Sequence, residues 1–168
     1  MRKTFAMTQD TVSPPTQSAD QRSELEALLP PPPLPIGSYV ATVQVGNLVH
    51  TSGVLPMKEG QVAVTGAVGS WDVSVAEGQE AARLCILNAL SLLRHALGSL
   101  DRVKRIVKLT GFVSSAPNFY EQPQVMNAAS DLLVAYFGEA GKHVRSAVGV
   151  ASLPKNAAVE VELVVEVA

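Results

Sequence analysis

Apolar and polar positions alternate along much of the chain after residue 34, which is the pattern of strands with one buried side. In Val159 to Val167 every second position is apolar, while Glu160, Glu162 and Glu166 share the other side. Gly46-Asn47 separates two apolar runs, and a two-residue turn of this composition predicts a β-hairpin. The strands predicted in this way are 40–45, 48–51, 61–65, 103–113, 145–150 and 159–167.

Two segments carry the three- and four-residue spacing of an amphipathic helix. The first runs from Ser74 to Leu97, where leucines recur along one side and Gly98 is a natural stop. The second runs from Pro123 to Phe137, before Gly138. The order of elements predicts an α+β domain with one mixed sheet of about six strands and both helices on one face. The other face of the sheet would then be bare.

Composition supports a buried surface on that face. Of the 168 residues 47% are hydrophobic and 17% are charged, and the mean hydropathy is +0.21. No run approaches the ~18 consecutive apolar residues of a membrane span, so we expect no membrane association. A water-soluble chain this apolar is expected to bury part of its surface between subunits, which predicts an oligomer.

The first 33 residues differ in composition from the rest. Residues 1–19 are polar and predict disorder, and 20–29 predict a short helix. The proline-rich run from Pro30 to Pro35 ends that helix and favours polyproline II. It is either a docking motif for a proline-recognising domain or a stiff strap into the domain, and the behaviour of such linkers favours the strap. We therefore expect a flexible N-terminal extension at 1–33 and a folded domain at 34–168.

Charge and cysteine content exclude several classes of function. The net charge of −2 and the pI near 5.9 argue against a nucleic-acid partner, and the basic residues between 102 and 108 alternate with apolar ones as in a strand with a solvated side. The one cysteine, Cys85, is expected to be a buried thiol on the first long helix. The N-terminus lacks the apolar core of a secretory signal, so the expected localisation is cytoplasmic. His50, His95 and His143 show no metal-ligand spacing.

Arg145 is the residue whose surroundings point to binding. It begins a strand of small and apolar residues, and a guanidinium that is partly removed from water needs an anion. That anion is either an internal carboxylate, Glu160 or Glu162, or the carboxylate of a ligand, which suits the fork geometry of arginine. The residues alone leave the two alternatives equal.

Six short stretches of the chain stand out together by their order and spacing. They are Gly37-Ser38-Tyr39, Val45-Gly46-Asn47-Leu48-Val49, Thr51-Ser52-Gly53-Val54-Leu55-Pro56, Arg145-Ser146-Ala147-Val148-Gly149-Val150, Leu153-Pro154-Lys155 and Val159-Glu160-Val161-Glu162. They resemble the signature segments of YjgF-like proteins, the reactive intermediate deaminase (Rid, endoribonuclease L-PSP-like) family, and the resemblance covers about residues 34–168. It implies a chorismate mutase-like fold and a homotrimeric barrel in which clefts between neighbouring subunits hold the ligand.

The resemblance also implies an activity. Active members of the family hydrolyse reactive 2-imino and enamino acids to 2-oxo acids and ammonia, with no metal or organic cofactor. By position, Arg145 would bind the substrate carboxylate, Glu160 would orient the attacking water, and Tyr39 would line the pocket and assist proton transfer. Ser52 corresponds to the family's pocket-lining serine, and Asn127 is the candidate for a family asparagine that binds substrate. Such a reaction needs little more than positioning and one general base.

The chain departs from the family pattern at two places. Gly37-Ser38-Tyr39-Val40 stands where Gly-Pro-Tyr-Ser is usual, and Ala147 stands where cysteine is common, which excludes thiol chemistry there. Three functions therefore remain, in decreasing order: a cofactor-free imine deaminase, a non-catalytic module that binds a small carboxylate metabolite through Arg145, and an endoribonuclease. The acidic balance and the lack of an aromatic and basic strip argue against the last.

Overall fold

The computed structural model describes residues 19–33, 35 and 37–168, so the disorder predicted at the extreme N-terminus lies outside the described residues. The helices and strands are α1 (Ala19–Ala27), β1 (Thr42–Val45), β2 (Leu48–Thr51), β3 (Met57–Lys58), β4 (Gln61–Val62), α2 (Val75–Leu97), β5 (Val103–Ser114), α3 (Gln122–Phe137), β6 (Val144–Val150) and β7 (Val159–Val167). Three short 3-10 turns lie at Leu100–Arg102, Gly138–Gly141 and Pro154–Asn156.

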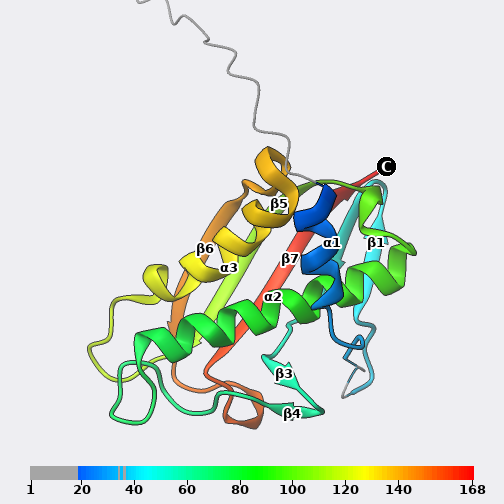
Figure 1. Cartoon of the computed structure of the whole chain (residues 1–168). Helices are drawn as coiled ribbons and strands as arrows, with labels where there is room; N and C mark the ends of the chain where they lie inside the picture. Colours follow the sequence, from blue (N-terminus) through cyan, green and yellow to red (C-terminus); the bar gives the residue numbers. More distant parts are fainter. Residues whose placement is uncertain (1–18, 34, 36) are drawn as a thin grey trace, which may run out of the picture.

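One five-stranded sheet forms the body of the domain, in the order β1-β2-β7-β5-β6. Strands β5 and β6 are parallel and the other neighbours are antiparallel, so the sheet is mixed. Helices α2 and α3 lie side by side across one face (Figure 1). This is the predicted α+β architecture, and it matches the chorismate mutase-like fold.

The strand predicted at 61–65 does not join this sheet. Only Gln61–Val62 is extended, and it pairs with Met57–Lys58 in a separate two-stranded hairpin. The turn between them places Glu59 and Gly60 at positive φ, which reverses the chain after two residues. The main sheet therefore has five strands rather than about six.

Local sequence explains where the principal turns and helix ends fall. Gly46 adopts a φ of +62° in the β1–β2 turn, as the predicted hairpin requires. Ser74 caps α2: its Oγ accepts from the backbone N–H of Glu77, and the Glu77 carboxylate accepts from the N–H of Ser74 at 2.8 Å. Such a capping box typically stabilises a helix by about 1 kcal/mol.

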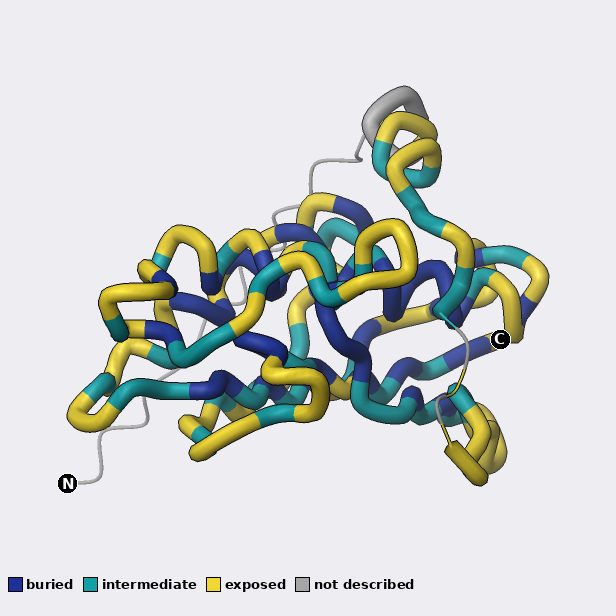
Figure 2. Tube along the Cα trace, turned by 90° about the horizontal axis from the view of Figure 1, so that it is seen from below, coloured by how far each residue is buried: buried dark blue, intermediate teal, exposed yellow. Residues whose placement is uncertain are grey.

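The core lies between the sheet and the two long helices, where buried segments run through the interior while turns and outer helix faces are exposed (Figure 2). Leu93 of α2, Leu109 of β5 and Leu133 of α3 are fully buried there. Gly111 of β5 lets α3 approach closely, because a Cβ at this position would lie 2.5 Å from the Cε of Met126. Cys85 is buried, as expected.

The described part of the N-terminal extension contacts the domain. Leu25 and Leu29 pack against the core, and the hydroxyl of Tyr136 donates a hydrogen bond to the Glu26 carboxylate. Ser91 of α2 donates to the backbone carbonyl of Pro30. The domain boundary at residue 34 stays a prediction.

The sheet face away from the helices is uncovered in the single chain, as predicted. Strand alternation and register place the exposed side chains of Val43, Val45, Val144 and Val148 on it. Lys108 and Thr110 of β5 and Glu162 of β7 lie between these valines on the same face. An uncovered face with exposed valines along both edges is expected to pack against another protein surface.

Candidate functional site

Three of the predicted site residues surround one cleft of about 690 Å³. Tyr39 precedes β1, Ser52 follows β2, and Glu160 lies near the start of β7. Strand β2 pairs with β7 only as far as His50. The segment after β2 meets β7 again in the isolated bridge between Val54 and Val161. The segment in between therefore passes beside Glu160.

Gly53 makes this arrangement possible. A Cβ built on Gly53 would overlap the Glu160 carboxylate, so the carboxylate can occupy its place only above a glycine. The Ser52-Gly53 pair thus has a direct packing role: it brings backbone close to Glu160 and leaves the Ser52 side chain at the cleft.

The environment of Glu160 favours its neutral form. Partial burial raises its pKa above the usual 4.5, and the negative charge of Glu162, two residues along the same side of β7, raises it further. The ion pairs of the described residues join Arg105 to Glu166 and Lys142 to Glu139, and neither offers Glu160 a cation. A carboxylate with a raised pKa is a stronger base than an ordinary glutamate.

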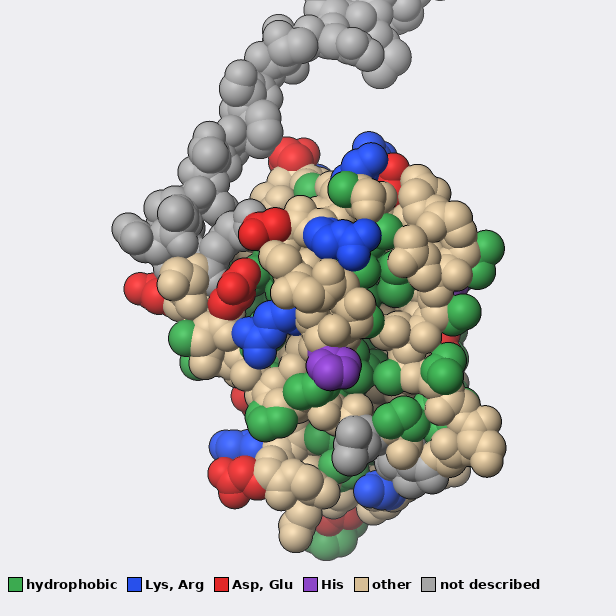
Figure 3. All heavy atoms as spheres, turned by 90° about the vertical axis from the view of Figure 1, so that its right-hand side faces the viewer, with side chains coloured by type: hydrophobic (Ala, Val, Ile, Leu, Met, Phe, Trp, Pro, Cys, Tyr) green, Lys and Arg blue, Asp and Glu red, His purple; other side chains and the backbone are tan. Residues whose placement is uncertain are grey.

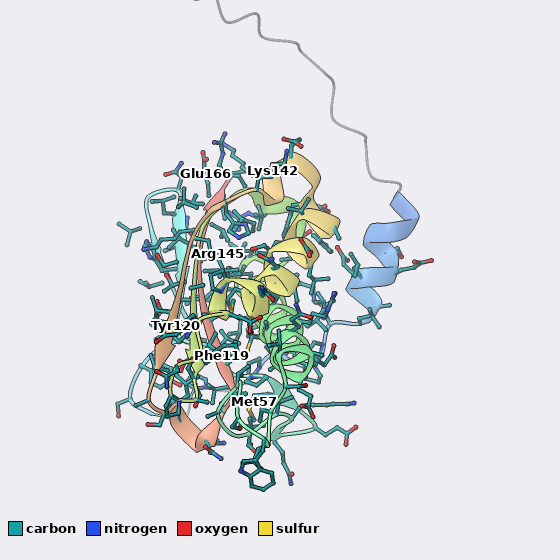
Figure 4. All side chains as sticks on the ribbon, turned by 90° about the vertical axis from the view of Figure 1, so that its left-hand side faces the viewer. Met57, Phe119, Tyr120, Lys142, Arg145 and Glu166 are labelled. Carbon is teal, nitrogen blue, oxygen red and sulfur yellow. The ribbon has the colours of Figure 1, made fainter. Side chains whose placement is uncertain are left out.

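Arg145 and Asn127 form a second group on the other side of the sheet. The Arg145 Nη1 donates to Asn127 Oδ1 at 3.1 Å and to Ser130 Oγ at 3.0 Å, and Nη2 donates to the carbonyl of Pro123 at 3.4 Å. All three partners are neutral and belong to α3 (Figure 4). Neither Glu160 nor Glu162, the two carboxylates that the sequence offered as partners, contacts the guanidinium. Among the described residues, Arg145 is therefore held in place without a counter-ion.

The two groups are separated within one chain. Leu109 of β5 pairs with Arg145 on one side and with Leu163 on the other, whereas Phe112 pairs with Glu160. Two strand spacings and three residues of rise give roughly 14 Å between the Cα atoms of Arg145 and Glu160. The Arg145 side chain points toward the helices. Glu160 alternates with the buried side chains of β7 and therefore lies on the opposite face of the sheet.

Sequence reasoning missed two residues that support Arg145. His143 donates from Nδ1 to the Gly141 carbonyl at 2.6 Å, so its Nε2 is the acceptor for the Ser130 hydroxyl at 3.1 Å. The pKa of His143 is lowered, mainly because the ring is partly buried. The hydrogen bond to Gly141 opposes this shift, and the positive charge of Arg145 adds to it. Ser130 follows Asn127 by three residues on a helix, and this spacing is the signal that could have found it.

Metal centres and membrane spans are two further possibilities for residues 19–33, 35 and 37–168. No group of three or more His, Cys, Asp or Glu side chains there is arranged to hold a metal ion. Within the same residues, none of the helices combines the length and apolarity needed to cross a membrane.

The fold is that of a chorismate mutase-like α+β protein, with a cleft at Glu160 and a separate group of side chains around Arg145. The family model described as "YjgF/chorismate mutase-like, putative endoribonuclease" matches residues 25–167. The chain belongs to this family.

Known proteins agree with that assignment. Protein TCP17 of Trypanosoma cruzi is 50% identical over 82% of this chain and 86% of its own length. A protein named 2-iminobutanoate/2-iminopropanoate deaminase from Dermatophagoides farinae is 34% identical over 79% of this chain and 88% of its own. The crystal structure of the protein Atu1372 from Agrobacterium tumefaciens, described as of unknown function, superposes with a TM-score of 0.81 at 46% identity, over 88% of this chain and 92% of that one.

Proposed function

We propose that this protein hydrolyses reactive 2-imino and enamino acids to 2-oxo acids and ammonia without a cofactor. The observation that carries the proposal is Glu160: a carboxylate in a cleft beside Ser52 and Tyr39, with a raised pKa and no cationic partner among the described residues. The named activity of the relative from Dermatophagoides farinae supports the same reaction class.

The chemistry assigns one task to each residue. A water oxygen adds to the electrophilic imine carbon while Glu160 accepts a proton from that water and passes it to the imine nitrogen. The resulting carbinolamine then collapses: Glu160 takes the hydroxyl proton and delivers it to the amino nitrogen, the carbon–oxygen double bond forms, the carbon–nitrogen bond breaks, and ammonia leaves. Tyr39 lines the cleft beside this path, where its hydroxyl can assist proton transfer, and Ser52 contributes a hydroxyl to the cleft wall.

Arg145 supplies the anchor for the substrate carboxylate, and Asn127 positions it. The neutral bonds from α3 fix the guanidinium without neutralising its charge, which is the state that a bidentate carboxylate site needs. Because Arg145 and Glu160 are far apart in one chain, the proposal places the complete site between two subunits. The uncovered sheet face, with exposed Val43 and Val148 at its two edges, is the surface through which a homotrimer would assemble.

A second candidate function is binding of a small carboxylate metabolite without turnover. The observation that favours it is that the Arg145 group is fully formed in the single chain without Glu160. The two candidates differ in their need for the carboxylate of Glu160.

The test generates 2-iminobutanoate enzymatically and follows release of the 2-oxo acid with and without the protein. Semicarbazide reacts with the free imine to form a semicarbazone. Faster hydrolysis by the protein leaves less imine to react, so it is measured as a lower yield of semicarbazone. The wild type is expected to accelerate release, and Glu160→Gln to abolish acceleration while 2-oxobutanoate still binds. Binding without acceleration by the wild type, with any imine tested, would establish the second candidate in place of the first.

A further inference from the structure

The cleft at Glu160 is much larger than the reacting groups require. We propose that its apolar part is a binding site for the side chain of the substrate, and that the preferred substrates are 2-imino acids with a branched aliphatic or aromatic side chain. This inference rests on the proposed function and names its substrate class. The observation behind it is the apolar wall of the cleft that also holds Glu160.

That wall consists of the side chains of Leu55, Met57 and Leu92, together with the prolines of the strap at 30–33. Leu55 lies two residues after Gly53, so the polar and apolar parts of the cleft are continuous along the chain. Hydrophobic side chains also gather on the molecular face that carries the β1 edge (Figure 3). A ligand in the cleft therefore meets hydrocarbon as well as the polar side chains of Glu160, Ser52 and Lys155.

Specific hydrogen bonds hold the wall in place. The amide of Asn88, 2% exposed, donates to the carbonyl of Met57 at 2.9 Å and to that of Leu55 at 3.4 Å, which ties the wall to α2. Ser91, one helical turn further along, donates to the carbonyl of Pro30 and ties the strap to the same helix. The cleft is thus formed before a ligand enters, and binding does not have to order these segments.

Size and polarity select the substrate class. Clefts of about 690 Å³ fall within the range that holds whole drug-sized ligands, whereas the methyl or ethyl group of a short imino acid would leave most of this cleft to water. Each methylene moved from water to an apolar site improves binding roughly fourfold. An isobutyl group, with three more carbons than methyl, is therefore expected to be preferred at least tenfold.

The experiment compares imines that an L-amino-acid oxidase makes from leucine, phenylalanine and alanine, with catalase to remove the peroxide. We expect kcat/KM for the leucine and phenylalanine products to exceed that for 2-iminopropanoate by at least tenfold. Met57→Trp, which fills the cleft, should lower this ratio at least tenfold. Gln61→Trp, on the opposite face of the same hairpin, is the matched control and should leave the ratio unchanged.

The failure of this inference can be told apart from failure of the proposed function. Equal or greater kcat/KM with 2-iminopropanoate overturns the side-chain site and leaves imine hydrolysis standing. If no imine is turned over, calorimetry with 4-methyl-2-oxopentanoate and pyruvate decides. Tighter binding of the former by at least tenfold, lost in Met57→Trp, supports the side-chain site even though hydrolysis fails. Equal binding, or no binding of either acid, overturns it.

Discussion

Arg145 on β6 and Asn127 on α3 are joined by a hydrogen bond of 3.1 Å from Nη1 to Oδ1. Helix α3 thereby fixes the orientation of a charged side chain on the edge strand of the sheet. The geometry explains how an arginine can stay ready for an anion: every partner it has within the described residues is neutral, so its charge is positioned but not satisfied.

Removal of the guanidinium should abolish catalysis without unfolding the protein. Arg145→Ala is expected to lower kcat/KM at least 100-fold, because a bidentate bond to a carboxylate contributes about 1.5–3 kcal/mol and orients the substrate as well. Arg145→Lys keeps the charge but loses the fork, and should recover only a small part of the loss. A change in oligomeric state in Arg145→Ala, measured by light scattering, would show that the residue has a structural role instead.

Ser130 should affect substrate binding more than turnover. Ser130→Ala removes one hydrogen bond to Arg145 and leaves Nε2 of His143 without its donor. At about 1 kcal/mol for such a bond, KM should rise roughly fivefold with little change in kcat. Asp131→Ala, at the neighbouring exposed position of α3, is the control and should leave KM unchanged. A fall in kcat alone in Ser130→Ala would contradict the positioning role.

Gly53 should tolerate no side chain without displacing Glu160. Gly53→Ala is expected to turn the Glu160 carboxylate away from its place, because the added Cβ would overlap it, and to reduce activity at least 100-fold. The carboxylate is the flexible end of a half-buried side chain, so the free energy of unfolding in denaturant titrations should change by less than about 1 kcal/mol. Full activity in a stably folded Gly53→Ala would show that the position of the carboxylate above Gly53 does not matter for turnover.

The raised pKa of Glu160 predicts how stability and kcat/KM depend on pH. Its pKa in the folded protein is raised, so folding favours the protonated form, and stability declines as the pH rises from the unfolded pKa through the folded one. Glu160→Gln should therefore unfold at a higher denaturant concentration than the wild type at pH 7, and the difference should vanish near pH 3. The acid limb of kcat/KM should have an apparent pKa above 4.5. A limb at or below 4.5 would remove Glu160 as the base.

Most helices and strands could be predicted from the sequence because turn residues and apolar spacing act within a few residues. The Gly46-Asn47 turn and the leucine stripe that ends at Gly98 each act within a few residues, and both elements formed where they were expected. The strand at 61–65 was predicted too long: after Val62 the chain continues as a loop, in which Ala63 is exposed and Val64 packs against the core.

The partners of Arg145 could not be predicted in the same way. They depend on how α3 docks on β6, and the charge of Glu160 or Glu162 made a salt bridge the natural alternative. The site residues Tyr39, Ser52 and Glu160 came from resemblance to a family. These three residues lie close together because the chain after β2 separates from β7 and pairs with it again at Val54. The alternation of apolar and polar residues does not reveal where such a break in strand pairing occurs.

In the proposed mechanism, each site for imine hydrolysis takes Arg145 from one subunit and Glu160 from another. Co-expression of Arg145→Ala and Glu160→Gln subunits, carrying different affinity tags, tests this arrangement. If neighbouring subunits share each site, a random one-to-one mixture pairs an intact Arg145 with an intact Glu160 in about one quarter of the sites, and about one quarter of wild-type deaminase activity should return. An isolated mixed oligomer that stays as inactive as either variant alone would contradict the shared site.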